Sequence, residues 1–140
     1  MRGTIRYREQ HAPIIRLARD LERHLIGDEL AKDASAARQL LSLLSGKLFV
    51  HLAVEDRLLY PGILHCEDPA VRAASQRFLQ EMGPISQAFK SDSIRWGTQG
   101  AIQSRPDAFV AETKQILAAV EERIRRENRA LYPLFEKLSP

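Results

Sequence analysis

His51 and Glu55 are four residues apart, a spacing that places two side chains on one face of an α-helix, one turn from each other. The neighbouring residues on this face are leucines, and a carboxylate on an apolar face is costly unless it is paired or bound to a metal ion. Imidazole and carboxylate groups are ligands for iron, manganese and zinc. The pair therefore indicates either a metal site or a hydrogen-bonded polar pair inside a helical core.

The segment that begins at Glu55 occurs a second time in the chain. Glu-Asp-Arg-Leu-Leu-Tyr-Pro at residues 55–61 is matched by Glu-Asn-Arg-Ala-Leu-Tyr-Pro at residues 127–133, seventy-two positions later. His-Ala-Pro-Ile from His11 and Met-Gly-Pro-Ile from Met82 form a second pair at almost the same offset. A fixed period of this kind indicates a structural unit used twice. We expect that unit to be a helical hairpin.

The second copy of the repeat has lost part of the donor pattern. Arg123 stands where the repeat places the counterpart of His51, and Met82 stands at the position of His11. We expect Met82 to pack in the core, because a thioether is a soft ligand that favours copper(I) over iron. Arg123 is expected to take one of two positions. Its permanently charged guanidinium is suited to pair with the buried glutamates. Alternatively, the guanidinium reaches solvent and only the aliphatic stem of the side chain is buried.

Amphipathic helices are expected to position these residues. Apolar residues recur at spacings of three and four, and strand patterns are almost absent. The predicted helices cover about residues 10–25, 35–59, 68–96 and 106–131. We expect Pro13 in the first turn of the first helix, an end or a kink of the second at residues 60–62, and a kink or a break into two helices at Gly83 and Pro84. Tyr60 and Tyr132 are expected to pack at helix ends.

Short loops between four long helices predict an all-α, up-down-up-down four-helix bundle built from two pseudo-repeated helical hairpins. The 140 residues are expected to form one domain, spanning residues 1–140. In an antiparallel bundle the start of the first helix can lie level with the end of the second, so donors on inward faces can meet. This arrangement gives one site with two imidazoles and two carboxylates, from His11, His51, Glu55 and Glu127.

Composition indicates which cellular compartment and which classes of partner to expect. The net charge of +3 is modest, and the local cluster of arginines around Arg123 is more typical of a solvated helix face than of a nucleic-acid interface. Cys66 is the single cysteine, so we expect no disulfide framework and a cytoplasmic protein. No apolar run approaches the length of a membrane span, so a membrane partner is not expected.

The pattern of these motifs resembles the hemerythrin-like, or HHE cation-binding, domain. The similarity rests on a histidine early in the first helix, His-x-x-x-Glu before a Tyr-Pro in the second, and the repeated arrangement in the last two, and it covers nearly the whole chain. The resemblance implies a four-helix bundle that holds two bridged non-haem irons. It places His11 and His51 at ligand positions and Glu55 and Glu127 at the positions of bridging carboxylates. Met82 and Arg123 replace the histidines that mainly serve one of the two irons.

Two functions remain open on this basis. The first is a non-haem domain that binds one iron-like ion, with manganese or zinc as alternatives, in a sensory or regulatory role. The second is a metal-free degenerate hemerythrin-like bundle that acts as a protein-interaction or regulatory module, with Arg123 neutralising the carboxylates. Oxygen carriage is disfavoured, because reversible binding of oxygen as peroxide takes two electrons, naturally supplied by two irons. No nucleophile triad or nucleotide-binding motif is visible, so enzymatic activity is uncertain and is not our expectation.

Overall fold

The computed structural model describes residues 2–138, although the side chains of residues 2, 3, 58, 82 and 138 lie outside that description. Every element in the described chain is helical, which confirms the predicted all-α class. The elements follow one another along the chain as α1 (Arg2–Arg23), α2 (Gly27–Lys32), α3 (Ser35–Val54), the π-helical turn η1 (Glu55–Leu59), α4 (Tyr60–Leu64), α5 (Pro69–Arg95), α6 (Gln99–Ser104), α7 (Pro106–Arg126), the π-helical turn η2 (Glu127–Leu131) and α8 (Tyr132–Leu138).

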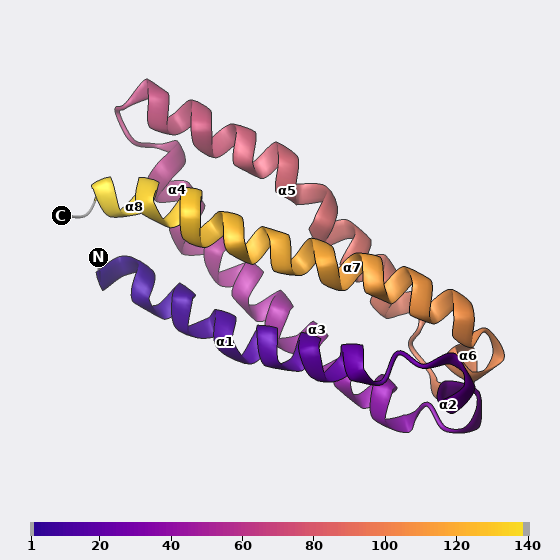
Figure 1. The fold of residues 1–140 in the computed structure, drawn as a ribbon. Helices are drawn as coiled ribbons and strands as arrows, with labels where there is room; N and C mark the ends of the chain where they lie inside the picture. The colour runs from indigo at the N-terminus through magenta and orange to yellow at the C-terminus, as the bar shows by residue number, and fades with distance from the viewer. Residues whose placement is uncertain (1, 139–140) are drawn as a thin grey trace.

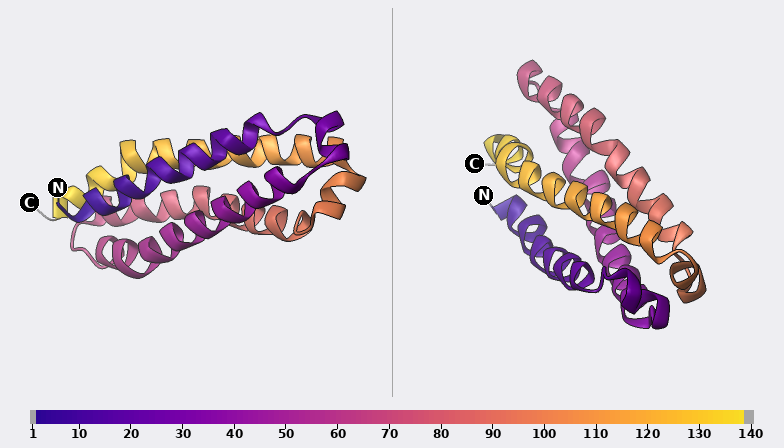
Figure 2. Two further views of the ribbon diagram at one scale, coloured as in Figure 1. Left: turned by 90° about the horizontal axis from the view of Figure 1, so that it is seen from below. Right: turned by 45° about the vertical axis from the view of Figure 1, so that its right-hand side comes forward.

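The four longest helices, α1, α3, α5 and α7, pack along one another, and successive ones run in opposite directions (Figure 1). The short helices α2 and α6 contact each other at the end where α1 connects to α3 and α5 connects to α7. Both termini lie at the opposite end of the molecule (Figure 2). Over the described residues, none of the helices carries an apolar stretch of the length and hydropathy that crossing a membrane requires.

The first helix begins earlier than the sequence predicted. α1 starts at Arg2, so Pro13 lies in the interior of the helix and the prediction that it occupies the first turn is wrong. The added turns have a tertiary partner. Thr4 Oγ1 donates a 2.6 Å hydrogen bond to Glu136 Oε1, and the Arg8 guanidinium pairs with the same carboxylate at 3.0 Å. The start of α1 is therefore held against α8, which lies beyond the predicted end of the last helix.

The second helix does not end at residues 60–62, so that alternative of the prediction is also wrong. The chain continues through η1 into α4, and the last helix likewise continues through η2 into α8. In each π-helical turn a backbone N–H bonds to the carbonyl five residues earlier, from Tyr60 to Glu55 and from Tyr132 to Glu127. Pro61 then stands in the first turn of the α-helical segment that follows the π-helical turn.

α5 begins where the sequence predicted. The Asp68 carboxylate accepts hydrogen bonds from the backbone N–H groups of Ala70 and Val71, and Pro69 occupies the first turn. The helix passes through Pro84 without interruption, so the predicted alternative of two shorter helices is wrong. The loop predicted before the last helix also contains α6, which is capped by the Thr98 hydroxyl.

A layer of buried polar side chains divides the hydrophobic core in two. On α1, Tyr7 belongs to one apolar cluster and Ile14 to the other, and His11 is buried between them. The same apolar, polar, apolar order recurs along the last helix at Ile124, Glu127 and Leu131. Because several helices each deliver a polar side chain to this level, the polar groups meet in the interior rather than at a surface.

Candidate metal centre

The buried polar layer brings together donor groups from four helical elements. His11 projects from α1 and His51 from α3, while Glu55 and Glu127 are the first residues of η1 and η2. These four residues are at most 3% exposed. The two copies of the repeat therefore place their glutamates at equivalent points, each at the start of a π-helical turn.

Three donor atoms converge on one point in this layer. His11 Nε2 lies 3.2 Å from His51 Nε2 and 2.9 Å from Glu127 Oε1, and His51 Nε2 lies 3.2 Å from the same oxygen. Metal–ligand bonds of about 2.0–2.2 Å to nitrogen and oxygen separate neighbouring ligand atoms by about 3 Å. The spacing of these atoms, and their types, therefore fit a single ion of the iron, manganese or zinc class.

The two histidines differ in what holds their second ring nitrogen. His51 Nδ1–H donates a 2.7 Å hydrogen bond to Gln10 Oε1, so Nε2 is the nitrogen that faces the donor cluster and would offer its lone pair to an ion once its own proton is lost. A partner of this kind fixes ring orientation and tautomer in metal-binding histidines. His11 Nδ1 is buried and has no hydrogen-bond partner among the described residues. Gln10 was not singled out by sequence reasoning, because a glutamine beside a histidine carries no specific signal.

Glu55 stands beside this cluster rather than within it. Its Oε2 lies 3.3 Å from His51 Nε2 and accepts a 2.8 Å hydrogen bond from the Tyr132 hydroxyl. The group of residues whose donor atoms all lie within 4.8 Å of one another consists of His11, His51 and Glu127. The fourth predicted ligand is thus close to the other three, and its carboxylate is engaged by a tyrosine.

Tyr132 is a second residue whose role at this site sequence reasoning missed. Its hydroxyl lies 2.9 Å from His11 Nε2, 3.5 Å from His51 Nε2 and 3.4 Å from Glu127 Oε1. The expectation that this side chain only packs at a helix end is therefore wrong. The signal was present in the repeat, which places a tyrosine five residues after each glutamate. The added residue of the π-helical turn separates that tyrosine from its glutamate by a full turn.

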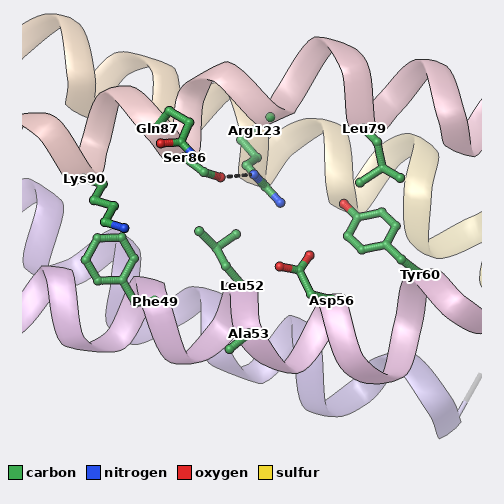
Figure 3. Close-up of a pocket in the computed structure, with 11 residues that line it drawn as sticks. Phe49, Leu52, Ala53, Asp56, Tyr60, Leu79, Ser86, Gln87, Lys90 and Arg123 are labelled. Carbon is green, nitrogen blue, oxygen red and sulfur yellow. Dashed lines mark hydrogen bonds between the residues drawn. The ribbon is translucent and has the colours of Figure 1, made fainter.

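Arg123 is buried against both glutamates. Its Nε lies 3.4 Å from Glu127 Oε2 and its terminal nitrogen lies 3.7 Å from Glu55 Oε1, while a third nitrogen donates to Ser86 Oγ at 2.7 Å. The residue is 6% exposed, so the alternative in which it reaches solvent is wrong. Figure 3 shows the guanidinium and Ser86 on the wall of a pocket of about 380 Å³, which Tyr60 also lines.

A family model for the hemerythrin HHE cation-binding domain matches residues 3–135. The chain belongs to this family. The match confirms the resemblance that the sequence motifs suggested, and it agrees with the cluster of His11, His51 and Glu127 as a partial set of metal ligands. Searches of curated proteins and of solved structures return no significant match.

Arg123 and Met82 stand at the two positions where the family resemblance leads us to expect histidines. The charge of Arg123 faces Glu55 and Glu127. Met82 lies within α5, and its side chain is outside the described part of the structure. The predicted core packing of Met82 therefore remains a prediction.

The two carboxylates of the hemerythrin-like site have different protonation preferences. Burial, together with the negative charge of Glu127, raises the pKa of Glu55 to about 7. Burial alone would raise the pKa of Glu127, but hydrogen bonds from His11 and His51 hold it well below its usual value. Burial opposes charge on His51, yet its bonds to Glu127 and Glu55 raise the pKa of this imidazole to about 9. Glu127 is thus ionised at neutral pH, whereas Glu55 is present there in both its protonated and its ionised form.

Proposed function

We propose that this chain is a non-haem metal-binding domain that holds one iron-like ion at His11, His51 and Glu127, with Glu55 next to it. The observation that carries the proposal is the mutual spacing of the three donor atoms, 2.9–3.2 Å, in a fully buried layer. Burying two imidazoles and a carboxylate so close together is costly without a partner of this kind. Membership of the cation-binding family supports the same conclusion.

The proposal includes one metal ion rather than two. In the repeat, Arg123 corresponds to His51, and its guanidinium lies against both glutamates where the repeat would place a second ion. A permanent positive charge at that point replaces the charge of a metal. We accordingly interpret the fold as an up-down-up-down four-helix bundle made of two related hairpins, of which only the first keeps its histidines.

A single ion suits a sensory or regulatory role better than oxygen carriage, since binding oxygen as peroxide draws on two electrons. Iron is the proposed ion because the family motif is that of iron-binding bundles, and manganese and zinc accept the same donor types. A cytoplasmic setting belongs to the same proposal, supported by the presence of Cys66 as the single cysteine.

Metal analysis of the purified chain tests this function. After anaerobic loading with Fe(II) and removal of excess ion, we expect about one tightly held ion per chain. His51→Ala should abolish that binding, whereas His24→Ala, at an exposed histidine outside the site, should leave it intact. A wild-type chain that retains no iron, manganese or zinc would overturn the proposal.

One observation favours a second candidate, the metal-free interaction module. Because Arg123 faces Glu55 at 3.7 Å and Glu127 at 3.4 Å, the buried carboxylates have a cationic partner without any metal ion. In that case the urea midpoint of unfolding should be the same with and without Fe(II). A midpoint that rises with Fe(II) concentration excludes this candidate, because a ligand that binds only the folded state stabilises it.

A further inference from the structure

Four oxygen and nitrogen atoms in the polar layer lie at nearly equal distances from one another. Besides the three donors already described, the fourth is the hydroxyl of Tyr132. The three donors are 2.9–3.2 Å apart, and the hydroxyl lies 2.9 Å from His11 Nε2, 3.5 Å from His51 Nε2 and 3.4 Å from Glu127 Oε1. All six distances thus fall within 2.9–3.5 Å, which makes the four atoms the corners of a nearly regular tetrahedron.

The dimensions of this tetrahedron match a metal coordination shell. A tetrahedron with edges of about 3.2 Å has its centre about 2 Å from each corner, which is the usual bond length from zinc or a similar ion to nitrogen and oxygen. In an octahedral shell no more than three ligands are all adjacent to one another. Four mutually adjacent atoms therefore indicate a four-coordinate ion.

We propose that the phenol oxygen of Tyr132 is the fourth ligand of the ion, so that the site is a tyrosinate centre completed by His11, His51 and Glu127. This inference rests on the metal site proposed above and goes further, because it assigns the coordination number and removes Glu55 from the ligand set. Binding as a phenolate would require Tyr132 to give up its hydroxyl proton, and the ionised form of Glu55, whose Oε2 accepts that hydrogen bond at 2.8 Å, would receive it.

The Tyr132 ring is held in place before any ion arrives. It stacks on Tyr7 with ring centres 5.9 Å apart and on His11 with ring centres 5.5 Å apart. The Arg8 guanidinium lies over the ring, 5.1 Å from its centre, and Arg8 itself pairs with Glu136. The hydroxyl thus reaches the donor cluster without a change of rotamer.

Tyr60 is the counterpart of Tyr132 in the repeat and provides a matched control. Its hydroxyl is buried and has no hydrogen-bond partner among the described residues, although the residue occupies the same position after a π-helical turn. This orphaned hydroxyl is explained if each copy of the repeat once supplied a tyrosine to its own ion. In the second site Arg123 stands in place of the histidine, so Tyr60 has no ion to bind.

Loading the full chain with Fe(III) tests the assignment, because a phenolate bound to iron(III) absorbs visible light by charge transfer whereas carboxylate and imidazole ligands do not give that band. We expect the wild-type chain and Tyr60→Phe to show the band, with phenolate vibrations in resonance Raman spectra excited within it. Tyr132→Phe should lose the band while still binding iron through the other three ligands. Replacing iron by Co(II) should give the intense visible absorption of a four-coordinate ion.

Each outcome decides the assignment. Iron bound by the wild-type chain without a phenolate band overturns the tyrosine ligand but leaves the proposed function standing. A band that survives in Tyr132→Phe overturns it as well. Absence of bound metal overturns both proposals. Should Tyr132→Phe fail to fold, the resonance Raman spectrum of the wild-type chain carrying ring-deuterated tyrosine decides, because phenolate modes that do not shift on labelling contradict a tyrosine ligand.

Discussion

Gln10 and His51, from α1 and α3, form a 2.7 Å hydrogen bond between Oε1 of the glutamine and Nδ1 of the histidine. The bond joins two helices at the level of the polar layer, next to His11 on the same helix as Gln10. Besides joining the two helices, the bond fixes which ring nitrogen of His51 faces the donor cluster. An imidazole that donates from Nδ1 presents the lone pair of Nε2, the form required to bind a metal ion.

Replacing Gln10 with alanine should therefore weaken metal binding without removing a ligand. We expect the affinity for Fe(II) or Zn(II) to fall about 10- to 100-fold, the usual effect of losing a partner that orients a metal-binding histidine. Competition titration with a coloured chelator measures this change. Gln76→Ala, at an exposed position on α5, is the control and should leave the affinity unchanged. Equal affinities for both variants would show that Gln10 does not orient His51.

Arg123→Met should destabilise the metal-free chain strongly. The methionine keeps much of the apolar stem but leaves the carboxylates of Glu55 and Glu127 without their cationic partner, at a cost of roughly 3–5 kcal/mol for a buried pair. Urea unfolding monitored by circular dichroism measures the loss. Addition of Fe(II) should recover part of it, because the ion supplies positive charge to the same layer.

Arg126→Met is the matched control for this experiment. Arg126 lies on the same helix and pairs with Glu81, but both side chains are well exposed, so the variant should lose less than about 1 kcal/mol. If Arg126→Met and Arg123→Met lost equal stability, the ion pairs of Arg123 would have no special role in the core.

Met82→His combined with Arg123→His should restore a second metal site. The double variant returns imidazoles to the two positions that the repeat and the family pattern assign to histidine. Of these two, Arg123 lies next to Glu55 and Glu127. We expect about two irons per chain and an absorption band typical of an oxo-bridged iron pair. Arg123→His alone should hold about one. A double variant that still binds a single ion would contradict the alignment of the two hairpins.

Asp92 on α5 provides a pH-dependent test outside the metal site. The residue is 6% exposed and its Oδ2 has no hydrogen-bond partner among the described residues. Burial, reinforced by the charge of Glu112, raises the pKa of Asp92 from 3.8 to about 6. A carboxyl with a raised pKa in the folded state holds its proton more tightly there than in the unfolded state. Its contribution to the free energy of unfolding therefore falls as pH rises from about 4 to about 6.

Asp92→Asn should remove this dependence, since the amide does not titrate. The free energy of unfolding of the variant relative to the wild type should increase by up to about 3 kcal/mol between pH 4 and pH 7, and the increase should level off above pH 6. Urea unfolding of both proteins at matched pH values measures the difference, and changes in other groups cancel in the comparison. Parallel stability curves across this range would show that the pKa of Asp92 is not raised.

Much of the architecture follows from local pattern. The spacing of apolar residues predicts helices, because a period of 3.6 residues can be recognised within a short stretch of sequence without knowledge of the rest of the chain. The seventy-two-residue repeat then indicates that two stretches share one structure, and the structure does place Glu55 and Glu127 at the start of equivalent π-helical turns. The proximity of His11, His51 and Glu127 could be predicted for the same reason, because the helical period places each of them on the inward face of its helix.

Other features were decided only by tertiary packing. The turns of α1 that precede its predicted start are held by Glu136, which lies more than a hundred residues away in the sequence. A local sequence pattern does not predict a partner that is so distant. The helices pass Pro61 and Pro133 because a π-helical turn absorbs the break that local rules predict. Whether Arg123 lies in the core or in solvent was settled by the two glutamates that face it.

The sequence by itself determined which apolar side chains point inward, because helical periodicity assigns each residue to a face. It did not determine that the Tyr132 hydroxyl would stand 2.9 Å from His11 Nε2 while the Tyr60 hydroxyl would have no partner among the described residues. The two tyrosines occupy equivalent places in the repeat, so local sequence treats them alike. Only the contacts between helices distinguish them, because a hydrogen bond depends on separations of a few tenths of an ångström that the packing of the whole bundle sets.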